Sequence, residues 1–157
     1  MKTIFFYQTS IGEIGLCENN NAITNLYFPE DIIPPGISVV ASDLLNEAAH
    51  QLRNYLAGVQ KVFTLPLAPT GSQFMTAVWQ QLPMIPFGKT RSYQEIAQAI
   101  GNPKASRAVG LANNRNPIPI FIPCHRVIGA NGRLTGYRGG LLLKEKLLAL
   151  ESTDGLF

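Results

Sequence analysis

The chain has 157 residues, 46% of them hydrophobic, which is enough for one globular domain or two small ones. No apolar run approaches the ~20 residues of a membrane span, and the residues after Met1 lack the pattern of a signal peptide. We therefore expect no membrane partner. The two cysteines are too few for a disulfide framework, which favours a reducing, cytoplasmic setting.

The first 28 residues have the composition of short strands joined by turns. Ile4–Tyr7 and Ile23–Phe28 are rich in branched and aromatic residues, which are typical of strands. Turn-forming residues lie between them at Ser10–Gly12 and Asn19–Asn21. The segment therefore predicts part of a small sheet.

A loop and then a helix follow this sheet. The loop covers Pro29–Gly36, and Ser42 or Asp43 caps a helix whose apolar residues recur at helical spacing until Gly58. Lys61–Leu65 predicts one more strand. Together these elements indicate a small α/β domain.

The proline-containing stretch Pro66–Gly71 reads as a linker. We therefore predict a small α/β domain over residues 1–66, a linker over 67–71 and a second domain over 72–157. The second domain begins with a helix, Ser72–Leu82, whose apolar stripe is most simply part of a core.

Two short helices joined by a tight turn come next. Ser92–Glu95 is a capping box that begins the first helix, and Gly101 stands where a left-handed cap ends it. Asn102-Pro103 restarts a helix that continues over Lys104–Asn113, which gives the helix-turn-helix pattern. The second helix has a small surface that lets its backbone approach a partner closely, made by Ala105, Ser106, Ala108, Gly110 and Ala112.

The charged residues between positions 89 and 138 are almost all basic. The net charge of the chain is only +3, but Glu95 is the one acidic residue in that stretch. A local basic field of this kind suits a phosphate backbone. A helix-turn-helix can also be a plain structural element, and the basic field favours DNA binding over that alternative. The basic residues are Lys89, Arg91, Lys104, Arg107, Arg115, Arg126, Arg133 and Arg138.

A cysteine directly beside a histidine, Cys124-His125, lies in the apolar run Ile122–Ile128. Prolines at positions 117, 119 and 123 exclude an ordinary helix over Asn116–Pro123 and bring the thiol to a fixed place. A thiolate is a nucleophile, and a neighbouring imidazole is a common way of forming one. A buried structural cysteine is the alternative that the pair alone does not exclude.

A glycine-rich loop and a helix complete the sequence. Asn131-Gly132 signals a tight turn, and Thr135–Gly140 is a flexible, close-packing loop. Leu141–Glu151 predicts a helix that ends on an acidic residue, where the helix dipole disfavours a carboxylate. That carboxylate is either a solvated helix end or held there for a purpose. The residues expected in the core are Leu142, Leu143, Leu147 and Leu150.

Several motifs together point to one protein family. The most specific is Pro123-Cys124-His125-Arg126-Val127, with Asn116-Pro117-Ile118-Pro119-Ile120 before it and Gly136-Tyr137 after it. Further matches are Phe74 with Val78-Trp79, Ser92-Tyr93, Gly101–Ala105, Arg107–Gly110 and Lys144–Glu151. The chain as a whole, and most strongly from residue 72 onward, resembles the O6-alkylguanine-DNA alkyltransferases.

The resemblance implies a ribonuclease-H-like α/β domain followed by a mainly α domain that holds the helix-turn-helix and the active site. It implies a monomeric DNA repair protein that binds duplex DNA carrying O6-alkylguanine from the minor groove and flips the base into a pocket. A cysteine thiolate then takes the alkyl group as a thioether, so each molecule acts once and needs no cofactor or metal. Whether O4-alkylthymine is also a substrate stays open.

By the same resemblance, Cys124 is the nucleophile and the alkyl acceptor. His125 acts as its base through a bridging water, because the side chains of consecutive residues point apart. Glu151 orients His125 and stabilises the imidazolium, as the third member of a Cys-His-acid arrangement. Asn116 supports this network.

The resemblance also assigns the residues at the DNA. Tyr93 donates toward the guanine and helps to rotate the target phosphate, and Arg107 fills the space that the flipped base leaves in the stack. Arg138 stands at a position that varies in the family, where a long side chain narrows or charges the pocket mouth. The residues expected to contact DNA are Ser92, Tyr93, Ala105, Arg107, Ala108, Gly110 and Arg115, and those expected in the base pocket are Val127, Tyr137, Arg138 and Gly139.

Other functions fit parts of the sequence. A Cys-His hydrolase would use Cys124 and His125, but it also needs an oxyanion hole that the sequence does not reveal. A lesion-binding module without chemistry would resemble the relatives that replace the active-site cysteine, which is present here. A zinc site on Cys124 and His125, or on Cys17 and His50, lacks four ligands at motif spacing, so no metal is expected.

Overall fold

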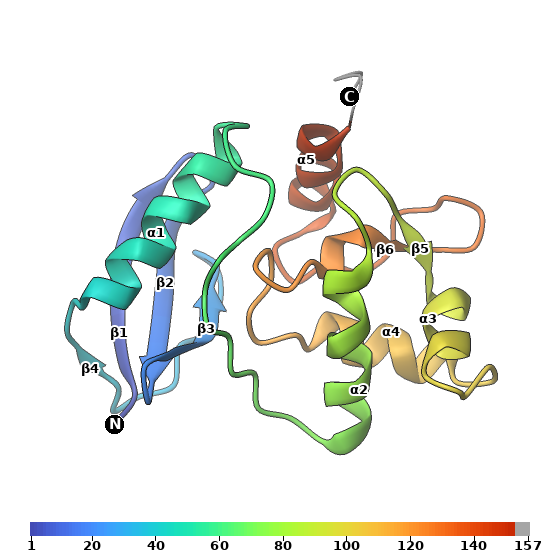
Figure 1. Ribbon diagram of the computed structural model, residues 1–157, viewed down its shortest axis with the longest axis horizontal. Coiled ribbons are helices and arrows are strands. Elements are labelled where there is room, and N and C mark those ends of the chain that lie inside the picture. Colours follow the sequence, from blue (N-terminus) through green and yellow to red (C-terminus); the bar gives the residue numbers. More distant parts are fainter. Residues whose placement is uncertain (153–157) are drawn as a thin grey trace. The chain divides into compact units, whose positions relative to one another are not determined.

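The structure of the protein is a computed structural model that describes residues 1–152 and divides into two compact units (Figure 1). The first unit is Met1–Thr70, and the second begins at Gly71. Residues 153–157, which belong to the predicted second domain, lie outside the described part. Within the described residues, no helix is both long and apolar enough to cross a membrane.

The first unit contains a four-stranded sheet with the order β3-β2-β1-β4. Strands β1 (Thr3–Thr9), β2 (Gly12–Asn19) and β3 (Ala22–Tyr27) pair antiparallel, as the two predicted turns require. The two asparagines between β2 and β3 both have positive φ angles, 51° and 61°, which this residue tolerates in a tight hairpin turn. The short strand β4 (Ser38–Val39) pairs parallel with β1 and was not predicted.

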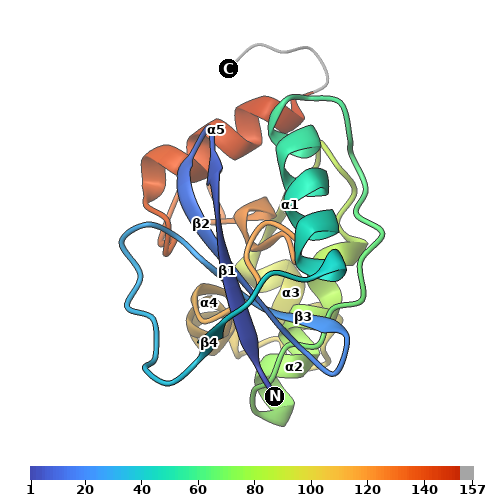
Figure 2. The ribbon, with the colours of Figure 1, turned by 90° about the vertical axis from the view of Figure 1, so that its left-hand side faces the viewer.

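Helix α1 (Asp43–Leu56) contacts strands β1, β2 and β3 and runs along the sheet (Figures 1 and 2). Ser42 is its N-cap, because the Ser42 hydroxyl accepts a hydrogen bond of 3.1 Å from the Leu45 amide. Gly58 follows the helix with a φ of 77°, as expected of a helix stop. The apolar face of α1 is buried in the core through Leu45, Ala48, Leu52 and Tyr55.

The strand predicted over Lys61–Leu65 is wrong, since the chain there has no regular pairing. The Gln51 side chain instead binds this segment and accepts a hydrogen bond of 2.9 Å from the Thr64 amide. Pairing with the sheet occurs only around Leu67, where the backbone of Ile23 bonds to both neighbours of that residue. Because proline has no amide proton, the Pro66 and Pro69 positions cannot extend a ladder.

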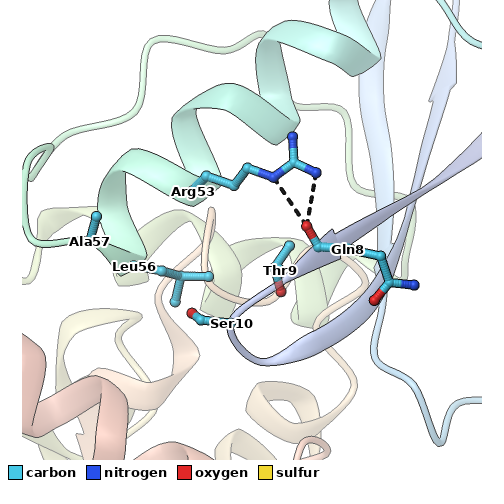
Figure 3. A pocket seen from close by; sticks show the side chains of 6 residues that line it. All are labelled: Gln8, Thr9, Ser10, Arg53, Leu56 and Ala57. Atoms are coloured by element: carbon cyan, nitrogen blue, oxygen red, sulfur yellow. Dashed lines mark hydrogen bonds between the residues drawn. The ribbon is translucent and has the colours of Figure 1, made fainter.

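A shallow cavity of about 410 Å³ lies between α1 and the turn after β1 (Figure 3). Its wall is fixed by Arg53, which donates two hydrogen bonds of 3.1 and 2.8 Å to the Gln8 carbonyl. None of the predicted site residues lines it. The lining residues are Gln8, Thr9, Ser10, Arg53, Leu56 and Ala57.

The second unit is mainly helical. Trp79 connects helix α2 (Gln73–Gln81) to helix α4 (Ser106–Asn114), because its indole donates a hydrogen bond of 2.9 Å to the Ala112 carbonyl. A parallel pair of two-residue strands, β5 (Arg91–Ser92) and β6 (Val127–Ile128), joins the start of α3 to the chain just after Cys124. The helices are α2 (Gln73–Gln81), the 3-10 helix η1 (Leu82–Met84), α3 (Tyr93–Ala99), α4 (Ser106–Asn114), the 3-10 helix η2 (Cys124–Arg126) and α5 (Leu141–Glu151).

Helices α3 and α4 form the predicted helix-turn-helix, but α4 begins later than expected. Asn102 was predicted to cap α4, yet its amide donates a hydrogen bond of 2.9 Å to the Ala97 carbonyl and so belongs to the end of α3. Together with Gly101, whose φ is 79°, this is the Schellman arrangement of a helix end. Ala105 is therefore the N-cap of α4, and residues 102–105 form a turn.

Helix α5 has the predicted bounds but not entirely the predicted core. Leu147 is buried as expected, whereas Leu142 is 68% exposed. Lys144 and Glu151 are buried instead. Positions 144, 147 and 151 are three, four and seven residues apart, so they lie on one face of the helix. This buried face therefore contains the two charged side chains, Lys144 and Glu151.

Candidate active site and DNA-binding surface

The segment before Cys124 is an irregular, buried loop held by one amide side chain. Asn116 donates a hydrogen bond of 2.7 Å to the Ile122 carbonyl and accepts one of 3.0 Å from the Ile118 amide. It thereby satisfies backbone groups that water cannot reach. Ile120 in this loop has a φ of 73°, which is strained for a β-branched residue. The prediction that this segment is not helical is confirmed.

Cys124 begins the 3-10 helix η2 and is 4% exposed. Its backbone is fixed on both sides, since its amide donates to the Ile122 carbonyl at 2.8 Å and its carbonyl accepts from the Asn113 side chain at 3.1 Å. Burial raises the pKa of the Cys124 thiol, and a hydrogen bond from Asn116 and the charges of Arg138 and Lys144 oppose this. The thiol therefore needs a base and nearby positive charge to react as a thiolate.

His125 is fully buried, and its Nε2 lies 2.7 Å from Oε2 of Glu151. Burial lowers the pKa of His125, although the Glu151 carboxylate acts in the opposite direction. A neutral imidazole that donates from Nε2 to a carboxylate has its acceptor lone pair on Nδ1. The burial of Glu151 also excludes the alternative that it is a solvated helix end.

Arg126 was predicted as part of a basic field that suits a phosphate backbone, but it is buried and so does not belong to an exposed surface. Its guanidinium donates two hydrogen bonds to the Glu151 carboxylate, of 2.8 and 3.0 Å, and a third of 2.8 Å to the Ile85 carbonyl. It also lies over the Phe87 ring, 5.8 Å from the ring centre. Because Arg126 balances the charge of Glu151, the carboxylate raises the pKa of His125 less than burial lowers it.

Lys144 of α5 is a second buried cation that was not predicted for the site. Its ammonium donates hydrogen bonds of 2.7 Å to the Val127 carbonyl and 2.8 Å to the Thr135 carbonyl. Burial lowers the pKa of Lys144 to about 8, and the Cys124 thiolate acts against this. The signal in the sequence is its two-turn spacing from Glu151, which places both charges on one helix face.

Tyr93, the first residue of α3, is half-buried and bonded to the glycine-rich loop. Its hydroxyl lies 2.8 Å from the Thr135 hydroxyl, and burial raises the pKa of the Tyr93 phenol. Ser92 and Glu95 form both hydrogen bonds of the predicted capping box, which fixes the start of the helix. Gly110 of α4 lies beside Tyr93, and a Cβ there would be 3.8 Å from its ring.

The loop that contains the predicted base-pocket residues is connected to the same cluster. The Arg138 side chain is exposed and donates a hydrogen bond of 3.1 Å to the Asn116 carbonyl. Val127 and Tyr137 are buried, and Gly139 is half-buried. The loop is thus tied to the cysteine segment at Arg138, and to α5 and α3 at Thr135.

The predicted DNA-contacting residues of α4 lie outside this buried cluster. Arg107 and Ala108 are exposed, as is Arg115 at the C-cap, whereas Ala105 and Gly110 are half-buried. The prediction that Ala112 adds to the small surface of this helix is wrong, because Ala112 is buried. The geometry therefore separates an exposed, basic helix face from a buried group of thiol, imidazole and carboxylate.

No three histidine, cysteine, aspartate or glutamate side chains within residues 1–152 lie close enough together to hold a metal ion. The comparison with protein families is unambiguous. The ribonuclease-like domain of 6-O-methylguanine DNA methyltransferase matches residues 4–69, and its DNA-binding domain matches residues 73–153. The chain belongs to the 6-O-methylguanine DNA methyltransferase family.

Relatives of this methyltransferase family match nearly the whole chain. A methylated-DNA–protein-cysteine methyltransferase of Methanosarcina acetivorans is 51% identical over 150 residues, which cover 94% of this chain and 96% of the relative. The constitutive enzyme of that name from Bacillus subtilis is 46% identical and covers 92% of both chains. The crystal structure of Mycobacterium tuberculosis OGT in complex with DNA superposes with a TM-score of 0.91, at 43% identity and 96% and 93% coverage. The predicted family, and the predicted fold of an α/β domain followed by a helical domain, are confirmed.

Proposed function

We propose that the protein is a methylated-DNA–protein-cysteine methyltransferase that repairs duplex DNA by moving the alkyl group of O6-alkylguanine to its own Cys124. The observation that carries the proposal is the buried Cys124-His125 pair with Glu151 2.7 Å from the imidazole, in a chain 51% identical to a relative of that name. The reaction class is nucleophilic displacement by an activated thiolate.

The transfer needs only one bond formed and one broken. His125 takes the thiol proton through a water, and the Cys124 sulfur attacks the alkyl carbon as its bond to O6 breaks. Guanine leaves and gains one proton, which in the net reaction balances the proton that the thiol gave up, and the alkyl group stays on sulfur as a thioether. Because a thioether does not release the group, each molecule reacts once. Glu151 stabilises the imidazolium that forms, and Asn116 holds the loop that positions the thiol.

The exposed face of α4 binds DNA in this proposal, and the target base turns into the pocket beside Cys124. Arg107 fills the space that the flipped base leaves in the stack. Tyr93 donates toward the guanine and helps to rotate the target phosphate. Val127, Tyr137 and the loop from Arg138 to Gly139 line the pocket. Ser92, Ala105, Ala108, Gly110 and Arg115 make the other DNA contacts. We further propose that residues 67–71 are a linker, that the protein is a monomer, and that it is located in the cytoplasm.

The direct test is the intact mass of the protein after mixing with duplex DNA that carries O6-methylguanine, followed by peptide mapping. We expect one added methyl group on the peptide containing Cys124, in at most a one-to-one amount. Unmodified DNA of the same sequence is the control. Folded protein that binds the modified duplex without any change of mass would contradict transfer and indicate a lesion-binding module instead.

Replacing Arg107 with alanine is expected to slow transfer from duplex DNA at saturating concentrations, while reaction with free O6-methylguanine is unchanged. Extruding the base from the stack costs a few kcal/mol. Loss of the side chain that fills the gap should therefore slow the reaction about tenfold or more. Single-turnover rates on both substrates measure this.

Arg115→Ala is the matched control, because Arg115 is also an exposed arginine of this helix region. It should weaken DNA binding by removing one charge without slowing the saturated rate. An Arg107 variant that loses the same fraction of rate on free base and on duplex would exclude the stack-filling role.

A further inference from the structure

The buried side chains around Cys124 carry an excess of positive charge. In the described part of the second unit, the buried charged groups are Arg126, Lys144 and Glu151. Glu151 is already balanced by two hydrogen bonds from Arg126, and burial keeps His125 neutral. Lys144 is therefore left as a surplus cation, which a thiolate on Cys124 would neutralise.

The hydrogen bonds of the Lys144 ammonium satisfy its donors without cancelling its charge. Its partners are two carbonyl oxygens, those of Val127 and Thr135, at 2.7 and 2.8 Å. A buried ion without an opposite charge is strongly unfavourable, and a lysine in such a place is expected to have a partner or to lose its proton. Val127 is only three residues from Cys124, across the turn of η2.

We propose that Lys144 is a positioning residue whose buried ammonium is the counter-charge of the Cys124 thiolate and whose two hydrogen bonds hold the glycine-rich loop against the cysteine segment. That the thiolate serves alkyl transfer rests on the proposed function. The attraction between the ammonium and the thiolate does not. When the thiol proton leaves for solvent, the thiolate makes the buried group electrically neutral. When His125 holds the proton, the Lys144 ammonium still attracts the thiolate, so formation of the thiolate is favoured in both cases where burial alone opposes it.

Other groups also face the thiol, and they are less suited to this role. Arg138 is a cation near Cys124, but its side chain is exposed, so water and salt screen its charge. Asn116 supplies a hydrogen bond without charge. Tyr93 is neutral, and His125 carries a positive charge only while it holds the proton of the thiol. Among residues 1–152, Lys144 is the buried cation near the thiol whose charge no carboxylate balances, since Arg126 is paired with Glu151.

The sign of the effect follows from the charge. A nearby cation favours the charged form of a thiol, so removing Lys144 should raise the pKa of Cys124 and move the rise of its reactivity to higher pH, by about one to three pH units. By reciprocity, the thiolate should keep the Lys144 ammonium protonated to a higher pH than it would otherwise be. A purely structural lysine would change the maximal rate but not the position of the rise.

The test measures the rate at which iodoacetamide modifies Cys124 between pH 6 and pH 11 in a Cys17→Ala background, by peptide mass. The variants are Lys144→Met, which has neither charge nor donor, and Lys144→Gln, which keeps a donor. Lys146→Met is the matched control, because Lys146 is an exposed lysine two residues away on the same helix. We expect the rise to shift to higher pH in both Lys144 variants and to stay in place in the control.

A second measurement needs no change at Lys144, so it does not depend on the folding of these variants. The pKa of the Lys144 ammonium is measured by NMR of labelled lysine in the native protein and in Cys124→Ser, whose hydroxyl does not ionise in this range. A lower lysine pKa in Cys124→Ser supports the proposal. Equal lysine pKa values in the two proteins would overturn it. So would Lys144 variants in which the reactivity of Cys124 rises at the same pH as in the native protein. Neither readout uses DNA, so both can succeed even if the proposed repair function fails.

Discussion

Replacing Cys124 with alanine is expected to abolish alkyl transfer completely while the protein still binds duplex DNA that carries O6-methylguanine. Alanine offers no nucleophile, and no base or carboxylate of the site can accept the alkyl group in its place as a thiolate does. Binding should persist because exposed Arg107 of α4 and Arg115 at its C-cap lie outside the buried cluster. Intact mass reports transfer, and fluorescence anisotropy of labelled duplex reports binding.

The second cysteine provides the control for this experiment. Cys17 lies fully buried in β2, where burial raises its pKa to about 11, so it is a poor nucleophile at neutral pH. Cys17→Ala should therefore transfer at the native rate. Methyl transfer that survives in Cys124→Ala, or that disappears in Cys17→Ala with the fold intact, would exclude Cys124 as the acceptor.

Replacing Glu151 with glutamine is expected to cost both stability and activity. The Glu151 carboxylate bonds to His125 and to the Arg126 guanidinium within 3.0 Å, and all three side chains are buried. Removing one partner of a buried ion pair leaves the other charge without compensation, which lowers the free energy of unfolding by about 3–5 kcal/mol. Loss of the carboxylate beside the imidazole should also slow transfer about a hundredfold. Urea unfolding followed by circular dichroism and single-turnover rates measure the two effects.

Arg126→Met separates these two consequences. It removes the guanidinium but keeps the carboxylate beside His125, so it should lower stability while transfer falls far less than in Glu151→Gln. The double variant should be less destabilised than the sum of the two single variants, because neither buried charge then stands alone. Strict additivity of the two changes would show that the ion pair contributes nothing specific, and equal rates for both single variants would remove Glu151 from the mechanism.

The parts of the fold that depend on local chemistry could be predicted from the sequence. The capping box at Ser92 and Glu95 and the left-handed glycine at Gly101 act within one or two turns of helix, so the residues themselves determine the structure. The prolines around Cys124 likewise exclude a helix without help from the rest of the chain. The family motif then indicated which of these elements would hold the candidate site.

The errors arise where a distant contact decides between equivalent local possibilities. Arg126 has the appearance of a surface cation in the basic stretch, and Lys144 that of a solvated lysine on a helix. The packing of α5 against η2 buries both. Lys61–Leu65 has strand-like residues, but Thr64 within it bonds to the Gln51 side chain of α1 through both its amide and its hydroxyl. Asn102 is a good helix cap by type, yet its amide is already used by α3.

The single tryptophan of the chain lies in α2 and gives this protein a fluorescent probe that contacts the helix-turn-helix. Trp79 is buried, and its indole N–H donates to the Ala112 carbonyl of α4, 2.9 Å away. Indole emission responds to the polarity and hydrogen bonding of its surroundings. A displacement of α4 that alters this bond would therefore change the emission of the unlabelled protein. Stopped-flow mixing with DNA could then time the docking of the helix separately from the later, covalent step.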